Sequence, residues 1–129
     1  MQEKYKILSV DDNTENNEII QEILGDIYNL KTAESGEEAL KTITEFKPDL
    51  VLLDIMMPGI DGYETCRRIK STPELKDTIV IMVSARDLLN DKIEGYEAGA
   101  FDYITKPFTE NDLIDSIAFF LEKCTSERS

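Results

Sequence analysis

The stretch Leu50–Gly59 constrains the fold more than any other part of this 129-residue sequence. It begins with the apolar run Leu50–Leu53, which Asp54 follows directly. A short apolar run with Pro-Asp before it and Pro-Gly after it is typical of a strand buried on both faces, although a buried helical segment gives a similar pattern. An ionised carboxylate at the end of such a strand is costly to desolvate. The rest of the chain must therefore supply groups that compensate Asp54.

Composition excludes several classes of function. The chain has 27 acidic and 14 basic residues, a net charge of −13, which argues against direct binding to nucleic acid or to an anionic membrane. It contains no histidine, so a Ser-His-Asp triad, a histidine metal site and an internal phosphohistidine are all excluded. Cys66 and Cys124 lack the spacing of a metal site and are predicted to be free thiols. Neither a membrane span nor a signal peptide is evident, so we expect a cytoplasmic protein.

The length fits one domain, residues 1–129 with a core of about residues 5–123. Strand and helix patterns alternate five times along it. Strands are expected at 5–10, 28–33, 50–53, 79–83 and 101–105. Helices are expected to begin at Asn13 or Thr14, Ser35, Asp61, Leu88 and Thr109. This alternation predicts an α/β fold with one doubly wound, parallel five-stranded sheet and helices on both faces.

Helical spacing predicts which side chains face the core. The fourth helix has a thin inward stripe of Leu89, Ile93 and Tyr96. The last helix has an inward stripe of Leu113, Ile114, Ile117, Phe120 and Leu121, with Phe119 off the stripe. We expect the polar residues from Thr125 onward to form a frayed tail.

Polar residues follow the expected strands at one edge of the sheet. Asp11 and Asp12 end the first strand, Asp54 ends the third, Ser84 ends the fourth, and Lys106 follows the fifth. The carboxyl ends of parallel strands meet at one edge, where ligands bind in such folds. We therefore expect these five residues to converge.

The convergence has a chemical logic. Three neighbouring carboxylates repel one another, and Mg²⁺ relieves that repulsion with an all-oxygen site. An aspartate can act as a nucleophile and form an aspartyl phosphate, while a lysine and a hydroxyl bind the phosphoryl oxygens. Simpler structural roles compete with this interpretation. Asp11 and Asp12 would also suit a turn and a helix cap, and Asp54 could be a buried, hydrogen-bonded carboxylate.

The chain resembles the receiver domain of two-component response regulators from about Tyr5 to Lys123. The resemblance rests on four motifs in order: Asp11-Asp12, Asp54 within Leu52–Gly59, Val83-Ser84-Ala85, and Lys106-Pro107. Each motif alone is weak, but the ordered set, each at its own strand end, is highly specific. The resemblance implies a (βα)5 flavodoxin-like fold with strand order 2-1-3-4-5.

The resemblance also implies the chemistry of the site. Asp54 would accept a phosphoryl group from a sensor histidine kinase or a histidine phosphotransfer protein. Mg²⁺, for which Mn²⁺ can substitute, would be held by Asp11, Asp12, Asp54 and the backbone carbonyl of Met56. The protein would catalyse only its own phosphorylation and dephosphorylation, and would not otherwise be an enzyme.

Further positions take a role only from the resemblance. Ser84 and Lys106 would bind the phosphoryl group, and the Lys106-Pro107 peptide bond would be cis. Ser84 and Tyr103 would form the conformational switch. The switched face, formed by the fourth helix, fifth strand and fifth helix, would control an effector protein or an output domain, or form a phosphorylation-dependent homodimer.

Two positions depart from common members of the family. Met56 is bulky and cannot orient an attacking water, and Arg86 lies two residues after Ser84. Both positions often modulate the lifetime of the phosphoryl group, so we predict slow self-dephosphorylation. The kinase, the pathway and the oligomeric state stay open, as does whether the chain acts alone or is part of a longer regulator or hybrid kinase.

Two other classes remain as alternatives. A flavodoxin-like redox carrier would need a Ser/Thr/Gly-rich phosphate loop after the first strand, where Asp11 and Asp12 would repel flavin phosphate. An aspartate-nucleophile phosphatase would need a second Asp two residues after the nucleophile, where Met56 lies instead.

Overall fold

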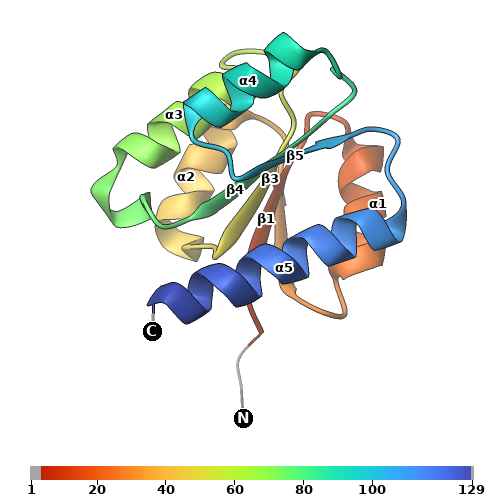
Figure 1. Cartoon of the computed structure of the whole chain (residues 1–129), viewed down its shortest axis with the longest axis vertical. Coiled ribbons are helices and arrows are strands. Elements are labelled where there is room, and N and C mark those ends of the chain that lie inside the picture. The colour runs from red at the N-terminus through yellow and green to blue at the C-terminus, as the bar shows by residue number, and fades with distance from the viewer. Residues whose placement is uncertain (1–3, 129) are drawn as a thin grey trace.

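The computed structural model describes residues 4–128, with side chains described for residues 4–122. Five parallel strands form one sheet in the order β2-β1-β3-β4-β5, with helices on both faces (Figure 1). The strands are β1 (Lys6–Val10), β2 (Asn29–Ala33), β3 (Leu50–Leu53), β4 (Ile79–Ser84) and β5 (Asp102–Thr105). The helices are α1 (Thr14–Leu24), α2 (Gly36–Phe46), α3 (Gly62–Ser71), α4 (Leu89–Ala98) and α5 (Glu110–Arg128), with a 3-10 turn at Pro73–Leu75. The predicted fold and strand order are confirmed.

Side-chain caps fix where three of the helices begin. Asn13 Oδ1, Ser35 Oγ and Asp61 Oδ1 each accept a backbone N–H from the first turn of α1, α2 and α3, at 2.8, 3.0 and 2.9 Å. A cap of this kind contributes about 1 kcal/mol to helix stability. The caps at Asn13 and Asp61 also set the length of the loops that leave β1 and β3.

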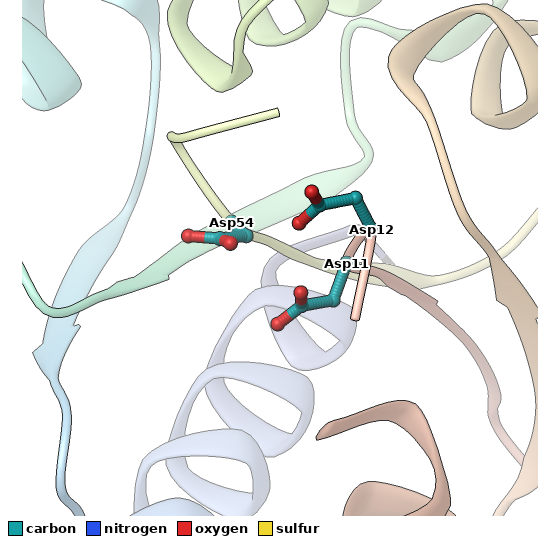
Figure 2. Close-up of side chains that lie close together, drawn as sticks. All are labelled: Asp11, Asp12 and Asp54. Carbon is teal, nitrogen blue, oxygen red and sulfur yellow. The ribbon is translucent and has the colours of Figure 1, made fainter. Parts of the chain in front are cut away.

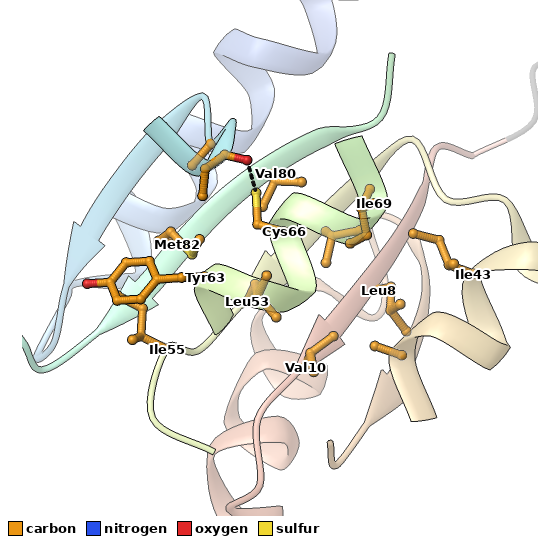
Figure 3. Packing of buried hydrophobic residues seen from close by; sticks show 14 of the residues in the cluster. Leu8, Val10, Ile43, Leu53, Ile55, Tyr63, Cys66, Ile69, Val80 and Met82 are labelled. Atoms are coloured by element: carbon orange, nitrogen blue, oxygen red, sulfur yellow. Dashed lines mark hydrogen bonds between the residues drawn. The ribbon is translucent and has the colours of Figure 1, made fainter. Parts of the chain in front are cut away.

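The sheet separates two hydrophobic clusters. Neighbouring residues of β3 point to opposite faces, as the pleat of a strand requires, and all four are at most 2% exposed. One cluster, the α2/α3/α4 layer, includes Leu53, Ile43, Tyr63, Cys66 and Ile69 (Figure 3). Val51 and Tyr103 belong to the same cluster. The other, the α1/α5 layer, includes Leu50, Leu52, Ile20, Leu24, Leu113, Ile117 and Ile104. The apolar run that opens the sequence is thus a strand buried on both faces.

The predicted inward stripe of α4 is wrong. Leu89, Ile93 and Tyr96 are 71, 43 and 49% exposed, and the buried residues of α4 are Gly95 and Ala98. A Cβ at Gly95 would lie 3.3 Å from Cδ2 of the Tyr103 ring. Small residues of α4 therefore face the sheet, because this helix packs closely against the Tyr103 ring on β5.

The last helix follows the prediction over its described side chains. Leu113, Ile117 and Leu121 are buried, Ile114 and Phe120 are partly buried, and Phe119 is 55% exposed. The expected frayed tail is instead helical as far as Arg128.

Cys66 is a buried free thiol, as predicted, and the side chain of Cys124 lies outside the described residues. Within residues 4–128, the helices all fall short of the length and apolar character needed to cross a membrane.

Candidate functional site

Three carboxylates meet where β1 and β3 end. Asp11 and Asp12 follow β1, and Asp54 follows β3, the strand paired with it. One carboxylate oxygen from each lies within 4.8 Å of the others, and Figure 2 shows the three groups turned toward a common space. Asp11 and Asp54 are buried, whereas Asp12 is exposed. The sequence prediction that these residues converge agrees with this geometry.

A lysine from the other half of the sheet reaches the same place. Lys106 follows β5, and its backbone N–H donates to the carbonyl of Ser84 at the end of β4. Its Nζ lies 2.8 Å from Asp11 Oδ2 and 3.9 Å from Asp54 Oδ2. The Lys106-Pro107 peptide bond is cis, as the family resemblance implied.

The donor set suits a hard divalent cation. Three carboxylates share one ammonium here, so negative charge exceeds positive charge among these four groups. The available ligand atoms are oxygens, one of them on an exposed residue where water completes a coordination shell, as Mg²⁺ prefers. Asp11, Asp12 and Asp54 therefore fit the predicted cation.

Asp54 is held in a buried position. Its Oδ1 accepts the backbone N–H of Ile55 at 2.8 Å, and its side chain is 11% exposed. Burial raises the pKa of Asp54 from an ordinary 3.8 to about 6, against the lowering effect of Lys106, with the neighbouring charge of Asp11 raising it as well. Lys106 alone thus does not offset burial, and this leaves a role for a cation in keeping Asp54 ionised.

Asp11 is positioned by groups that sequence reasoning missed. Its carboxylate accepts the backbone N–H of Asn13 at 2.9 Å and the side-chain amide of Asn16 at 3.1 Å. Asn17 is buried, and its amide donates to the carbonyls of Asp11 and Ala33 at 2.9 and 3.2 Å. The burial of Asn17 could have been predicted from helical spacing, because Asn17 falls on the same face of α1 as Ile20 and Leu24.

Gly62 is a second position that sequence reasoning missed. It is the first residue of α3, and its backbone N–H donates to the carbonyl of Ile55 at 2.8 Å. A Cβ there would clash with the carbonyl oxygen of Asp54. Only a residue without a side chain lets α3 begin this close to the backbone of Asp54 and Ile55.

Ser84 and Tyr103 lie near the site but are turned to the loop after β4. Ser84 is 1% exposed, and its Oγ accepts the backbone N–H of Arg86 at 3.3 Å. The Tyr103 ring is buried, and its hydroxyl donates to the carbonyl of Arg86 at 2.6 Å. Burial raises the pKa of the Tyr103 hydroxyl, which stays protonated and a donor. Their role as a switch remains a prediction.

Met56 and Arg86 both line a hollow of about 350 Å³ beside the acidic cluster. Asp12 lines the same hollow. The Met56 side chain is exposed, and Arg86 Nε lies 3.2 Å from Asp91 Oδ1. The two positions predicted to modulate phosphoryl lifetime therefore border the site.

A larger cavity of about 630 Å³ adjoins Asp54 and Lys106 on the other side. Apolar side chains line most of it, chiefly Ile19, Ile20, Ile23, Val83, Pro107 and Phe108. Its lining extends from Asp11 and Asp54 along α1 to Glu110 at the start of α5.

Known proteins share this fold and this sequence pattern. The family model for the response regulator receiver domain matches residues 7–118, which contain every site residue above. Response regulator MprA of Mycolicibacterium vanbaalenii is 37% identical over 123 residues, covering 95% of this chain and 52% of that relative. The chain spans about half the length of the first curated relatives it matches.

Solved structures agree. The BeF3-activated receiver domain of DrrB, a Thermotoga maritima protein, has a TM-score of 0.85 at 37% identity, covering 92% of this chain and 98% of that one. A CheY-like receiver domain protein from Methanospirillum hungatei has a TM-score of 0.88 at 30% identity, covering 96% and 98%. Neither alternative class, flavodoxin-like carrier or phosphatase, is favoured by these similarities.

Proposed function

Because this chain belongs to the response regulator receiver domain family, and is therefore a receiver in phosphorelay signalling, we propose that Asp54 accepts the phosphoryl group. The observation that supports this most is the place of its carboxylate, with Lys106 Nζ 3.9 Å away and two further carboxylates within 4.8 Å. Asp54 is a buried carboxylate that lies close to the Lys106 ammonium and to two further carboxylates that fit Mg²⁺. These are the surroundings that phosphoryl transfer requires.

In the proposed reaction, an Asp54 carboxylate oxygen attacks the phosphorus of a phosphohistidine. A bond forms between this oxygen and phosphorus while the phosphorus–nitrogen bond breaks, and its electron pair stays on the imidazole. Lys106 offsets negative charge on the phosphoryl oxygens. The Ser84 hydroxyl donates to one of them after turning from its present contact with the Arg86 N–H.

Asp11, Asp12, Asp54 and the Met56 backbone carbonyl are the proposed ligands of Mg²⁺ or Mn²⁺. When bound, the cation would supply positive charge to the carboxylates and to the phosphoryl oxygens. Asn13 and Asn16 fix the Asp11 carboxylate through two hydrogen bonds, so that it keeps its place beside Lys106.

The proposed donor is a sensor histidine kinase or a histidine phosphotransfer protein. The apolar cavity along α1 gives the donor a surface beside Asp54, with Ile19 48% exposed at its edge. Phosphorylation would change the face formed by α4, β5 and α5, and so control an effector protein or an output domain. The proposed location is the cytoplasm, where these donors and Mg²⁺ are available.

Acetyl phosphate with Mg²⁺, read by intact mass, tests the assignment. The wild type should gain one phosphoryl group, and Asp54→Asn should gain none. Asp77→Asn is the matched control, because it removes an exposed carboxylate just before β4, away from the site. A phosphoryl gain in Asp54→Asn, or none in the wild type, would overturn the proposal.

We propose that the chain catalyses only its own phosphorylation and dephosphorylation. Loss of phosphate should be slow, because the exposed Met56 side chain offers no group to orient an attacking water. A half-life of seconds in the purified phosphoprotein would contradict this.

A further inference from the structure

One ion pair and several hydrogen bonds hold the loop between β4 and α4, residues 85–88, in place. Arg86 Nε lies 3.2 Å from Asp91 Oδ1, and Asp91 Oδ2 accepts the backbone N–H of Leu88 at 3.3 Å. Leu88 is the N-cap of α4 and has no side-chain oxygen to accept an N–H of the first turn, so Asp91, through the N–H of Leu88, makes the one side-chain hydrogen bond at this cap. A single carboxylate thus holds both the arginine and the first turn of α4.

Two tyrosines fasten this loop to the core. Tyr103 donates its hydroxyl to the carbonyl of Arg86 at 2.6 Å, and Tyr63 of α3 donates its hydroxyl to the carbonyl of Asp91 at 3.1 Å. Both rings are buried in the α2/α3/α4 layer. We call Tyr63, Arg86, Asp91 and Tyr103 the loop latch. It joins the backbone after Ser84 to α3, α4 and β5.

The guanidinium of this latch borders the phosphorylation site. Arg86 lines the hollow of about 350 Å³ together with Asp12 and Met56, and its side chain is 47% exposed. The Asp91 carboxylate that holds it is 12% exposed. An arginine pair that is half open to water is weak and readily exchanges partners. A phosphoryl group offers Arg86 a more charged and bidentate partner than Asp91 does.

We propose that Arg86 is a second phosphoryl-binding cation, which Asp91 holds in reserve until Asp54 is phosphorylated. This inference rests on Asp54 being the phosphoryl acceptor. On phosphorylation the guanidinium leaves Asp91 and binds the phosphoryl oxygens across the hollow, on the side away from Lys106. Asp91 keeps its bond to Leu88 but loses its countercharge at the start of α4.

The proposed exchange also gives a role to Tyr63, which is not part of the predicted Ser84–Tyr103 switch. Its hydroxyl donates to the backbone carbonyl of Asp91 from α3, so the backbone that carries the carboxylate stays in place when the guanidinium leaves. Tyr63 is therefore a positioning residue, and it makes α3 a fixed support against which the loop moves.

The affinity for BeF3⁻, a stable mimic of the phosphoryl group, tests the exchange. It can be measured with Mg²⁺ present by titration followed on the amide NMR signals of the full chain. Asp91→Asn keeps an oxygen for the Leu88 N–H but removes the charge that competes for Arg86. We expect it to tighten BeF3⁻ binding by about fivefold, the value of a partly exposed ion pair. Arg86→Gln should weaken binding by about tenfold, through loss of a charge-assisted hydrogen bond.

The double variant separates this exchange from a merely structural role. In the Arg86→Gln background, Asp91→Asn should no longer change the affinity, because no guanidinium remains to be released. Glu64→Gln is the matched control: it breaks an exposed carboxylate–arginine pair at the start of α3, 2.9 Å long, that lies outside the latch. It should leave the affinity within about twofold, since exposed pairs of this kind act locally.

The outcomes distinguish the two proposals. If the wild type binds BeF3⁻ but Asp91→Asn does not tighten binding, or tightens it equally without Arg86, the reserve role of Arg86 is wrong and Asp54 stands as acceptor. If the folded wild type does not bind BeF3⁻ at all, the acceptor assignment fails and this inference fails with it.

Discussion

Asp54 should destabilise the protein when no cation is bound, and its replacement by asparagine should therefore stabilise the fold. Burial raises the pKa of Asp54 in the folded chain to about 6, against 3.8 for an ordinary aspartate side chain. The side chain is 11% exposed, so solvent screens this effect little. Asparagine has nearly the same shape, carries no charge, and can still accept the Ile55 N–H.

The sign of the pH dependence follows from linkage. The folded state holds the Asp54 proton more tightly than the unfolded state, so ionisation favours unfolding. The contribution of this group to stability is complete below pH 3.8 and is lost as the pH rises through about 6. The corresponding cost to the wild type is about 1 kcal/mol at pH 4.5 and about 3 kcal/mol at pH 8. This cost is already net of the attraction of Lys106, and asparagine resembles the protonated carboxyl, so we expect Asp54→Asn to gain about 1–3 kcal/mol at pH 8.

Urea unfolding followed by circular dichroism measures this gain between pH 4.5 and pH 8. With EDTA present, the free energy of unfolding of Asp54→Asn should exceed that of the wild type increasingly as the pH rises. Adding Mg²⁺ should stabilise the wild type more than the variant, because a ligand stabilises the state that binds it. Asp77→Asn controls for the general effect of removing one negative charge. Equal stability of Asp54→Asn and the wild type at pH 8 in EDTA would refute this reasoning, as would a gain that does not vary with pH.

Three further substitutions test the positioning of the site. Asn17→Ala should lower the free energy of unfolding by about 3 kcal/mol, because it leaves two buried carbonyls and the Ser9 hydroxyl without the amide; a loss under 1 kcal/mol in urea unfolding would contradict this. Lys106→Met should raise the pKa of Asp54 above 6, since it removes the neighbouring ammonium, and carboxyl NMR titration in EDTA would show an unchanged value if the interaction were unimportant. Gly62→Ala should cost about 2 kcal/mol or more and shift the Asp54 backbone signals, because its Cβ has no room beside that carbonyl; an unshifted spectrum would contradict the close packing.

The sequence was most informative where local chemistry decides the structure. The apolar run Leu50–Leu53, with Pro-Asp before it and Pro-Gly after it, favoured a buried strand over a buried helical segment. Asn13, Ser35 and Asp61 favoured helix starts because each can cap a helix. The positions of the polar residues at the strand ends then predicted which side chains meet in the site. These predictions needed only neighbouring residues and the geometry of a parallel sheet.

The sequence was least informative where a side chain's partner depends on how a helix sits on the sheet. The exposed stripe of α4 reads as a core face until Gly95 is seen to make room for Tyr103. The buried amide of Asn17 and the pairing of Arg86 with Asp91 likewise depend on contacts across elements. Spacing along one helix cannot supply these, because it fixes which residues share a face but not what that face meets.

The sheet separates the core into two clusters, and this affects how such a protein can evolve. Adjacent residues of β5 belong to different clusters: Tyr103 packs in the α2/α3/α4 layer and Ile104 in the α1/α5 layer. Substitutions without shared partners have nearly additive effects. The surface along α1 that we assign to the phosphoryl donor can thus acquire new specificity while the layer beneath α4 stays as it is. A mutation that changes which phosphoryl donor binds along α1 therefore need not alter the output face around α4.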